Sequence, residues 1–449
     1  MKKRALIRAM LLLLSLLLLT SCQNTVSNEG HTTEGETTAT TSNPNISENE
    51  LLLVSDRQAY CGIVRAKDAS ADIKSLCSKL SDTIVSKTKS TMQLIADTRQ
   101  LSDGMIEILI GDTNRPESAE AKKMLGKQEY SVSVVNGKVV VVGSDDVMLE
   151  KAIAHLINMI ESPSEQLERG TWTISKTYNE QFDGSDYKYN DYIGKGFELT
   201  AEHTLLKKMS PSGGTTTAGE RIPWVQGGCT DGTYYYYCMI TDDSVTPTKC
   251  VILKYDIAKQ SMVKNSAELQ MGHANDAAYN PHNNTIVVSA GGTSYYVIDP
   301  DTLKVKKTVQ MESCWAISYD VERRLYILAN NSSIYFYDDN YQFQNKFSIA
   351  GDMLSEYPTN GNMGTQGITS DSKYIYYLEY WQNKSVKTDI RCNIVVFDIN
   401  NGNLVDRIPL KMGREVENII IWNNSFYIVC NNITWTGAEC YQIKLVPKI

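Results

Sequence analysis

The sequence contains few of the residues and motifs on which catalytic and metal-binding sites are commonly built. It has five histidines among 449 residues, and no two of them are spaced like a pair of metal ligands. It has no Gly-x-Ser-x-Gly nucleophile motif, no phosphate-binding loop, no Cys-x-x-Cys pair and no calcium loop of alternating aspartates. We therefore expect no cofactor and no metal, and the sequence offers no recognisable catalytic set.

Positive charge and long apolar runs are also scarce. The chain has 44 Lys and Arg against 52 Asp and Glu, a net charge of −8, and no basic cluster beyond its first eight residues. A chain this acidic is a poor match for nucleic acid, which we do not expect as a partner. The one long apolar run, residues 10–20, is shorter than the roughly 20 residues that a membrane-spanning helix needs.

The beginning of the chain has the order of features that is typical of an exported protein. Four basic residues precede the apolar run, which ends in Leu19-Thr20-Ser21-Cys22. These four residues resemble the lipobox of bacterial lipoproteins. That resemblance implies removal of residues 1–21, lipidation of Cys22 and a location outside the cytoplasmic membrane. The membrane would then be a partner through the lipid on Cys22, since two acyl chains hold a protein firmly.

The segment that follows is too polar to fold. Residues 23–50 contain no aromatic residue and only two large aliphatic ones, Val26 and Ile46. Such a segment cannot bury enough apolar surface to offset the entropy of ordering it. We therefore expect residues 22–50 to be a lipidated cysteine followed by a disordered tether.

The cysteines are predicted to be mostly reduced. Ten are present, and nine remain if Cys22 is acylated, so they cannot all pair within the chain. Several lie inside apolar runs, among them Cys238 and Cys430, where cysteine behaves as a small core residue.

Residues 51–178 alternate short strand-like runs with amphipathic helical stretches. One apolar stripe predicts a helix, at Ile73, Leu76, Cys77, Leu80 and Ile84. Asn136-Gly137 between two valine-rich runs predicts a hairpin with a type I′ turn. We expect a small α+β sandwich here, followed by a linker over residues 179–195.

Residues 107–118, together with that hairpin and the helix after it, resemble the N-terminal accessory domain of α-glucuronidases and β-hexosaminidases. In those enzymes the domain is not catalytic, and the active site lies on a barrel that follows it. No barrel-length alternation of strands and helices follows here. The resemblance therefore implies only a loose association with glycan-handling surface proteins.

From about Ile222 onward one phrase recurs. Residues 226–237 closely match residues 366–377, and further copies begin at Asn275, Trp315 and Glu417. The first four copies in chain order continue into a strand that ends in aspartate, at Asp256, Asp299, Asp338 and Asp398. Four short antiparallel strands in each repeat of roughly 40–45 residues resemble the blades of β-propeller repeat proteins.

The copies predict a propeller of five blades over residues 196–449. The last copy has room for three strands only, which would leave an unpaired sheet edge. The segment Phe197–Leu206, just before the first copy, is the expected fourth strand and would close the ring. A sixth, divergent blade within residues 180–222 is the alternative.

A ligand site is expected at the channel mouth where the innermost strands begin. Superposing the copies makes five residues equivalent: Gln226, Asn275, Cys314, Gln366 and Glu417. Others flank them: His273, Asp276, Glu312, Trp315 and Glu415. The expected ligand-binding residues are Gln226, His273, Asn275, Trp315, Gln366 and Glu417, because amides, an acid, an imidazole and an indole suit a sugar or a peptide. Alternatively, these side chains bond to one another and close the channel.

Three functions remain open from the sequence. The favoured one is a non-catalytic binding or scaffold protein, tethered to the membrane, that holds a glycan or peptide at the channel mouth. The second is a propeller glycoside hydrolase or lyase that uses Asp276 and Glu417 as its carboxylate pair. The third is a subunit of an envelope protein complex.

Overall fold

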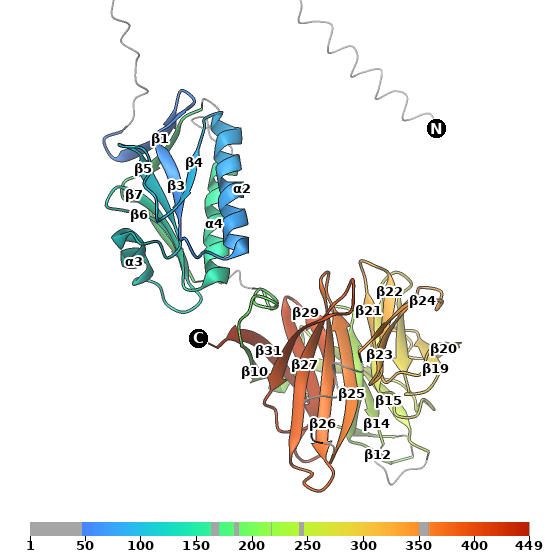
Figure 1. Ribbon diagram of the computed structural model, residues 1–449. Coiled ribbons are helices and arrows are strands. Elements are labelled where there is room, and N and C mark those ends of the chain that lie inside the picture. The colour runs from blue at the N-terminus through green and yellow to red at the C-terminus, as the bar shows by residue number, and fades with distance from the viewer. Residues whose placement is uncertain are drawn as a thin grey trace, which may run out of the picture.

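The computed structural model describes residues 47–162, 170–183, 188–216, 218–241, 247–349, 358 and 360–448. The predicted signal peptide, Cys22 and most of the predicted tether lie outside the described residues. No helix in the described part of the chain is long and apolar enough to span a membrane. A smaller region of helices and strands precedes a larger region built of strands (Figure 1).

The N-terminal region is built on a six-stranded mixed sheet with the strand order β4-β3-β5-β7-β6-β9. In chain order these strands are β3 (Cys61–Arg65), β4 (Gln93–Ala96), β5 (Ile106–Ile110), β6 (Tyr130–Val135), β7 (Lys138–Gly143) and β9 (Asn179–Phe182). The first four in the sheet pair in parallel, and β6 pairs antiparallel with β7 and β9. A second sheet contains β1 (Glu50–Ser55), β2 (Gln58–Ala59) and β8 (Trp172–Ser175).

Two long helices, α2 (Ala71–Thr88) and α4 (Asp146–Glu161), lie side by side and cover one face of the main sheet (Figure 1). Both begin at a side-chain cap, in which Ser70 and Asp145 accept a hydrogen bond from a first-turn backbone N–H. The predicted stripe of α2 is buried in the core at Ile73, Cys77, Leu80 and Ile84. The type I′ turn is also confirmed, because Asn136 and Gly137 both have positive φ angles of 49° and 76°.

Two elements of this region differ from the sequence expectation. The short helix α3 (Pro116–Lys122) was not predicted, although Pro116 stands at its favoured place in the first helical turn. Strand β9 falls in the segment that the sequence analysis assigned to a linker. It pairs with β6, whose edge would otherwise be unpaired, so the linker proper begins after Phe182.

The C-terminal region, within the described residues, contains five four-stranded antiparallel sheets. The first is β13 (Trp224–Thr230), β14 (Tyr234–Ile240), β15 (Cys250–Asp256) and β16 (Ser261–Asn265). The second is β17 (Asp276–Asn280), β18 (Thr285–Ser289), β19 (Ser294–Ile298) and β20 (Val305–Gln310). The third is β21 (Ala316–Asp320), β22 (Leu325–Ala329), β23 (Ser333–Asp338) and β24 (Phe343–Ser348). The fourth is β25 (Gly361–Ser370), β26 (Tyr374–Asn383), β27 (Ile390–Asp398) and β28 (Leu404–Leu410).

The fifth sheet joins the two ends of the C-terminal region. It contains β29 (Val416–Trp422), β30 (Ser425–Asn431), β31 (Ala438–Pro447) and, outermost, β10 (Leu199–Leu205). Strand β10 pairs with β31 from Leu199 opposite Pro447 to Leu205 opposite Tyr441. This is the pairing expected from the sequence, and it covers the edge that the last copy would have left open.

The innermost strands of these sheets surround one axis. Each of β13, β17, β21 and β25 contacts the innermost strand of the next sheet, and β29 contacts β13 again. The region is therefore propeller-like (Figure 1). Segment 180–222 adds only β10, the two-stranded sheet of β11 (Gly214–Thr215) and β12 (Arg221–Ile222), the end of β9 and the 3-10 turn η1 (Lys207–Met209) to the described structure.

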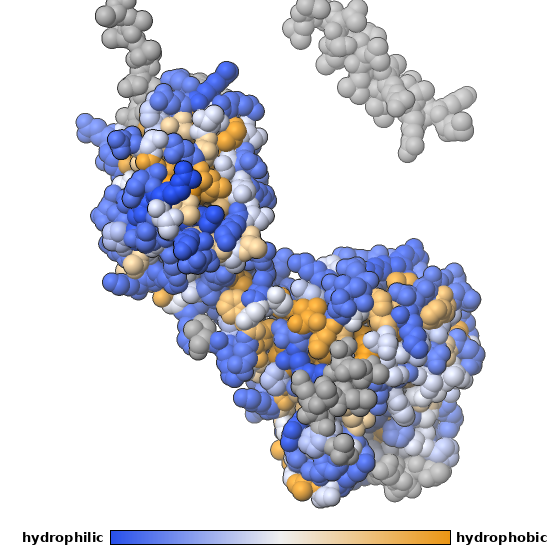
Figure 2. Space-filling model, in the orientation of Figure 1, coloured by the Kyte–Doolittle hydropathy of each residue, from blue (hydrophilic) through white to orange (hydrophobic). Residues whose placement is uncertain are grey.

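The segment between the two regions is hydrogen-bonded to both. Tyr189 Oη and Asn190 Nδ2 donate to Asp371 Oδ2 of the fourth sheet over 2.7 and 2.8 Å. Tyr192 Oη donates to Asp145 Oδ2, at the start of α4, over 3.1 Å. In Figure 2 hydrophilic residues cover most of the face in view on both regions, with smaller hydrophobic areas between them.

The cysteines agree with the sequence expectation. Nine described cysteines, from Cys61 to Cys440, are free thiols, and all of them are buried. Burial raises the pKa of several of these thiols, so they are poor nucleophiles and serve the core as small apolar groups.

Candidate functional site

A pocket of about 700 Å³ opens at the channel mouth where the innermost strands begin. All six residues predicted to bind ligand line it: Gln226, His273, Asn275, Trp315, Gln366 and Glu417. Seven others complete the lining: Trp224, Asn331, Met363, Gly364, Thr365, Glu415 and Trp435. The repeat equivalence read from the sequence therefore corresponds to a shared place in space. Whether these residues bind a ligand is not decided by their convergence.

Three of the polar side chains reach the pocket from β-bulges. The pairing register shifts between Val225 and Gly227, between Thr365 and Gly367, and between Val416 and Asn418. Gln226, Gln366 and Glu417 are the extra residues at these shifts. A bulge breaks the strict alternation of a strand and re-aims one side chain, and bulges are common beside functional sites.

The amide groups in the pocket mostly donate to protein acceptors. Gln366 Nε2 donates to Glu415 Oε1 over 2.6 Å, and Gln226 Nε2 donates to the carbonyl of Val225 over 3.2 Å. Gln226 Oε1 accepts from Nδ1 of His273 over 3.2 Å. His273 is exposed, and this bond leaves its Nε2 as an acceptor when the ring is neutral.

Two carboxylates, Glu415 and Glu417, lie together in the wall of the pocket. Glu417 is 2% exposed, and its Oε1 accepts from Asn431 Nδ2 over 2.7 Å. Burial, and next the nearby charge of Glu415, raise the pKa of Glu417 well above its ordinary value. Burial also raises the pKa of Glu415, and the hydrogen bond from Gln366 offsets this only in part.

Indole rings supply the apolar surface of the pocket. Trp315 and Trp435 are each 45% exposed, which is unusual for so large an apolar side chain. Trp224 packs edge-on against Trp435, with ring centroids 5.7 Å apart. Trp315 lies over Gly291, where a Cβ atom would come within 2.5 Å of the indole ring, so only glycine leaves room for it.

Asp276 is not part of this pocket. It is fully buried, and along β17 it lies between Asn275, which lines the pocket, and Ala277, which lines the opposite mouth. Its Oδ1 accepts from the N–H of Ala277 over 2.9 Å and from Asn418 Nδ2 over 2.7 Å, and its Oδ2 accepts from the N–H of Ile317 over 2.9 Å. Asp276 thus connects three innermost strands.

The placement of Asp276 bears on the hydrolase hypothesis. Asp276 and Glu417 do not face one another across an open channel, as an acid–base pair would have to do around a substrate. Asn418, which donates to Asp276, also donates to the carbonyl of Gly228 over 3.0 Å, so it ties the first and fifth sheets together. The side chains of Asp276 and Asn418 therefore hold the strands of the channel wall together.

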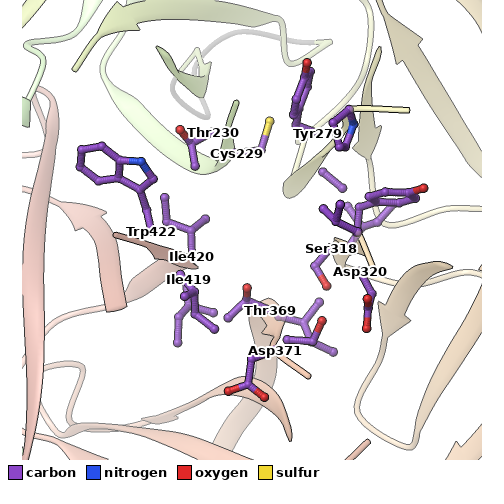
Figure 3. Close-up of a pocket in the computed structure, with 18 of the residues that line it drawn as sticks. Cys229, Thr230, Tyr279, Ser318, Asp320, Thr369, Asp371, Ile419, Ile420 and Trp422 are labelled. Atoms are coloured by element: carbon purple, nitrogen blue, oxygen red, sulfur yellow. The ribbon is translucent and has the colours of Figure 1, made fainter. Parts of the chain in front are cut away.

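The opposite mouth holds a second cavity of about 560 Å³, where the innermost strands end. Figure 3 shows its lining side chains around a central space, with Ile419, Ile420 and Trp422 on one side and Tyr279 on another. Its acids are Asp231, Asp320, Glu322 and Asp371.

The aspartates at this second mouth hold the turns between first and second strands. Asp231 Oδ1 accepts from the N–H groups of Thr233 and Tyr234 over 2.8 and 2.7 Å. Asp371 Oδ1 accepts in the same way from the N–H groups of Lys373 and Tyr374 over 2.7 and 2.8 Å. These carboxylates are satisfied within the fold.

Sequence reasoning missed several residues of the first pocket. Trp224 and Trp435 lie outside the aligned phrase, Trp435 in the loop between β30 and β31, where the copies share no pattern. Asn331 and Met363 likewise have no counterpart in the repeat. For Trp224 a signal was available, because it stands two residues before Gln226, whereas nothing in the sequence brings Trp435 to this mouth.

Comparisons with known proteins leave the family of this chain open. No protein-family model matches it, and no curated protein matches it. Among solved structures, it is similar to a glutaminyl cyclase from Myxococcus xanthus with a TM-score of 0.37 and 9% sequence identity. That similarity covers 56% of this chain and 99% of the other.

Proposed function

We propose that the C-terminal region is a five-bladed propeller that binds a glycan, without catalysis, at the mouth where its innermost strands begin. The observation that carries this proposal is the pocket of about 700 Å³ in which indole rings and amide side chains converge. Sugar rings present apolar C–H faces and polar edges, so they match indoles beside amide groups. A peptide is a weaker match, because within the described ranges no unpaired strand edge accompanies the pocket for its backbone to extend.

A non-catalytic role is supported by what surrounds the carboxylates. Asp276 is committed to three hydrogen bonds inside the channel wall. Glu415 and Glu417 lie on the same strand end, so they cannot flank a scissile bond from opposite sides as hydrolytic carboxylates do. Ligand binding therefore explains the pocket without the opposed pair of carboxylates that catalysis would require.

The test is binding of the mature chain to glycans of defined composition. Titration calorimetry with chito-oligosaccharide tetramers, xylan fragments and solubilised peptidoglycan is expected to find at least one ligand. Replacing Gln226, Trp315 and Gln366 together by alanine should weaken its binding at least about tenfold, which corresponds to about 1.4 kcal/mol.

A matched control separates this pocket from the opposite mouth. Trp422→Ala removes an indole that lines the second cavity and does not line this pocket, and it should leave the affinity unchanged. Thermal melting of each variant confirms that it is folded. Equal affinity of the triple variant and the parent chain would refute binding at this pocket.

We also propose that the chain is anchored outside the cytoplasmic membrane by lipid on Cys22. The support is the order of basic residues, apolar run and lipobox-like ending in the sequence. Metabolic labelling with radioactive palmitate should mark the full chain in the membrane fraction, and Cys22→Ser should abolish the label. A label that persists in Cys22→Ser would show that this cysteine is not the lipidated residue.

A further inference from the structure

One buried acceptor of the first pocket is unpaired. Three of the pocket's amides, those of Gln226, Asn331 and Gln366, each donate one hydrogen bond to a protein acceptor. Oδ1 of Asn275, in contrast, is buried and has no hydrogen-bond partner among the described residues. An unpaired buried acceptor favours a ligand that donates a hydrogen bond to it.

The carboxylates of the pocket add negative charge without a counter-charge. Among the described residues that line it, none is Lys or Arg. Arg414, next to Glu415 in the chain, is paired with Glu439 instead, and its guanidinium lies 6.0 Å from the centre of the Tyr441 ring. Among the described residues, the hydrogen-bond partners of the two glutamates are the amide groups of Gln366 and Asn431. Buried carboxylates are normally paired with a cation.

Electron-rich ring faces surround the same space. Trp315 and Trp435 expose much of their indole surface at the rim, and Trp224 packs beside the second of them. The face of an indole attracts an organic cation more strongly than any other side-chain ring does. A buried carboxylate, a partly buried carboxylate and exposed indoles in one cavity thus favour the same chemical group, a cation.

We propose that the ligand carries a protonated amine, held between Glu415 and Glu417 and covered by the indoles of the pocket. An ammonium has three donors and no acceptor, which complements a pocket whose spare groups accept. The inference rests on the proposed glycan function and narrows it to glycans with an unacylated amino sugar. Such a unit presents the charge on the same small ring whose C–H face stacks on an indole.

Protonation of the empty pocket is consistent with this assignment. Burial raises the pKa values of Glu415 and Glu417, and the charge of Glu415 raises that of Glu417 further, so the empty pocket retains protons to higher pH than exposed glutamates would. An ammonium would replace those protons as the counter-charge. Binding should therefore release protons, and calorimetry in buffers of different ionisation enthalpy measures that release directly.

The experiment compares two oligosaccharides that differ only at nitrogen. The probes are the tetramer of glucosamine and the tetramer of N-acetylglucosamine, titrated into the mature chain at pH 7. The unacylated tetramer should bind at least about tenfold more tightly. Glu415→Gln with Glu417→Gln should bring the ratio of the two affinities close to one, since this change removes the charge and keeps the shape.

A control is needed because the whole chain is acidic and the glucosamine tetramer is cationic. Glu120→Gln with Glu161→Gln changes the net charge by the same amount at exposed positions of the N-terminal region. This variant should keep the affinity ratio of the parent chain. A loss of preference in it as large as in the pocket variant would reveal general charge attraction and overturn the proposal.

The failure of this inference is distinguishable from the failure of the glycan function. Equal or tighter binding of the acetylated tetramer would overturn the amine assignment and leave a glycan site in place. Binding of neither tetramer, together with binding of a short lysine-containing peptide that the Glu415/Glu417 variant loses, would overturn the glycan assignment. The parent chain gives the affinity ratio, and the pocket and control variants show whether that ratio comes from the pocket.

Discussion

Carboxylates gather at both mouths of the channel, but their surroundings differ. At the mouth where the innermost strands end, Asp231 and Asp371 each accept several hydrogen bonds from turn N–H groups and tyrosine hydroxyls. At the mouth where the strands begin, Glu415 and Glu417 each have one amide partner and lie beside indoles. The first arrangement stabilises the fold, whereas the second costs stability, as is expected of the ligand site proposed above.

The contrast teaches that acidity alone does not mark a site. Both mouths have carboxylates, and both have cavities of several hundred Å³. The number of hydrogen-bond donors that face each carboxylate separates the turn aspartates from the pocket glutamates. That count can be tested by removing carboxylates one at a time and measuring the free energy of unfolding.

The largest effect is expected from Asp276, which lies between the two mouths. Asp276→Ala leaves the N–H groups of Ala277 and Ile317 and the amide of Asn418 without their acceptor in a fully buried place. We expect a loss of about 3–5 kcal/mol in the free energy of unfolding, measured by urea denaturation. Asp231→Ala, in a turn near solvent, is the control and should cost about 1 kcal/mol. Equal losses would mean that Asp276 does not bind the innermost strands together.

A smaller effect, with opposite signs at the two mouths, is expected from neutral amide replacements. The pKa of Glu417 is raised, so its ionisation in the folded chain costs stability at pH above its ordinary pKa. Glu417→Gln should therefore increase the free energy of unfolding by about 1–2 kcal/mol near pH 8, and the gain should vanish below about pH 4.

Asp371 should behave in the reverse way. Burial acts to raise its pKa, but hydrogen bonds from Tyr189, Tyr376 and two backbone N–H groups outweigh burial and lower it. Its contribution to stability is therefore present above its ordinary pKa and is lost as the pH falls. Asp371→Asn should destabilise the chain by about 1–2 kcal/mol near pH 7, less so at pH 3. Thermal melting across this pH range checks the sign of the stability change for Glu417→Gln and for Asp371→Asn. If both variants were stabilised or both destabilised, the proposed difference between the two mouths would be wrong.

Much of this arrangement could be predicted from the sequence because the phrase repeats. The matching glutamines Gln226 and Gln366 lie at equivalent bulges in two innermost strands, and Glu417 lies at the corresponding bulge in a third strand. Because the phrase repeats, residues at matching positions of the copies can be identified as equivalent without knowing where their side chains point. The pairing of β10 with β31 was equally predictable, since an unpaired edge in a closed ring needs a partner.

The direction of individual side chains could not be predicted. Asp276 follows Asn275 in the chain and looked like a pocket residue, but β17 has no bulge, so strict alternation turns it into the channel wall. The sequence offered one clue to this. Gly227 and Gly367 stand at the position of Asp276 in two other copies of the repeat. At Gly227 a Cβ atom would come within 2.5 Å of the backbone at Asn275 and Asp276, so the neighbouring strand leaves no room for a side chain at this position.

The pairing of β10 with β31 has a consequence for how the chain reaches its structure. Leu205 pairs with Tyr441, 236 positions later, so the ring closes only when nearly all of the C-terminal region is available. Contacts at such sequence separation are slow to form, because the entropy of closing the loop is lost before the pairing is gained. The pairing of β10 with β31 must also break before the first and fifth sheets can separate. The fold should therefore assemble slowly and, once assembled, open rarely.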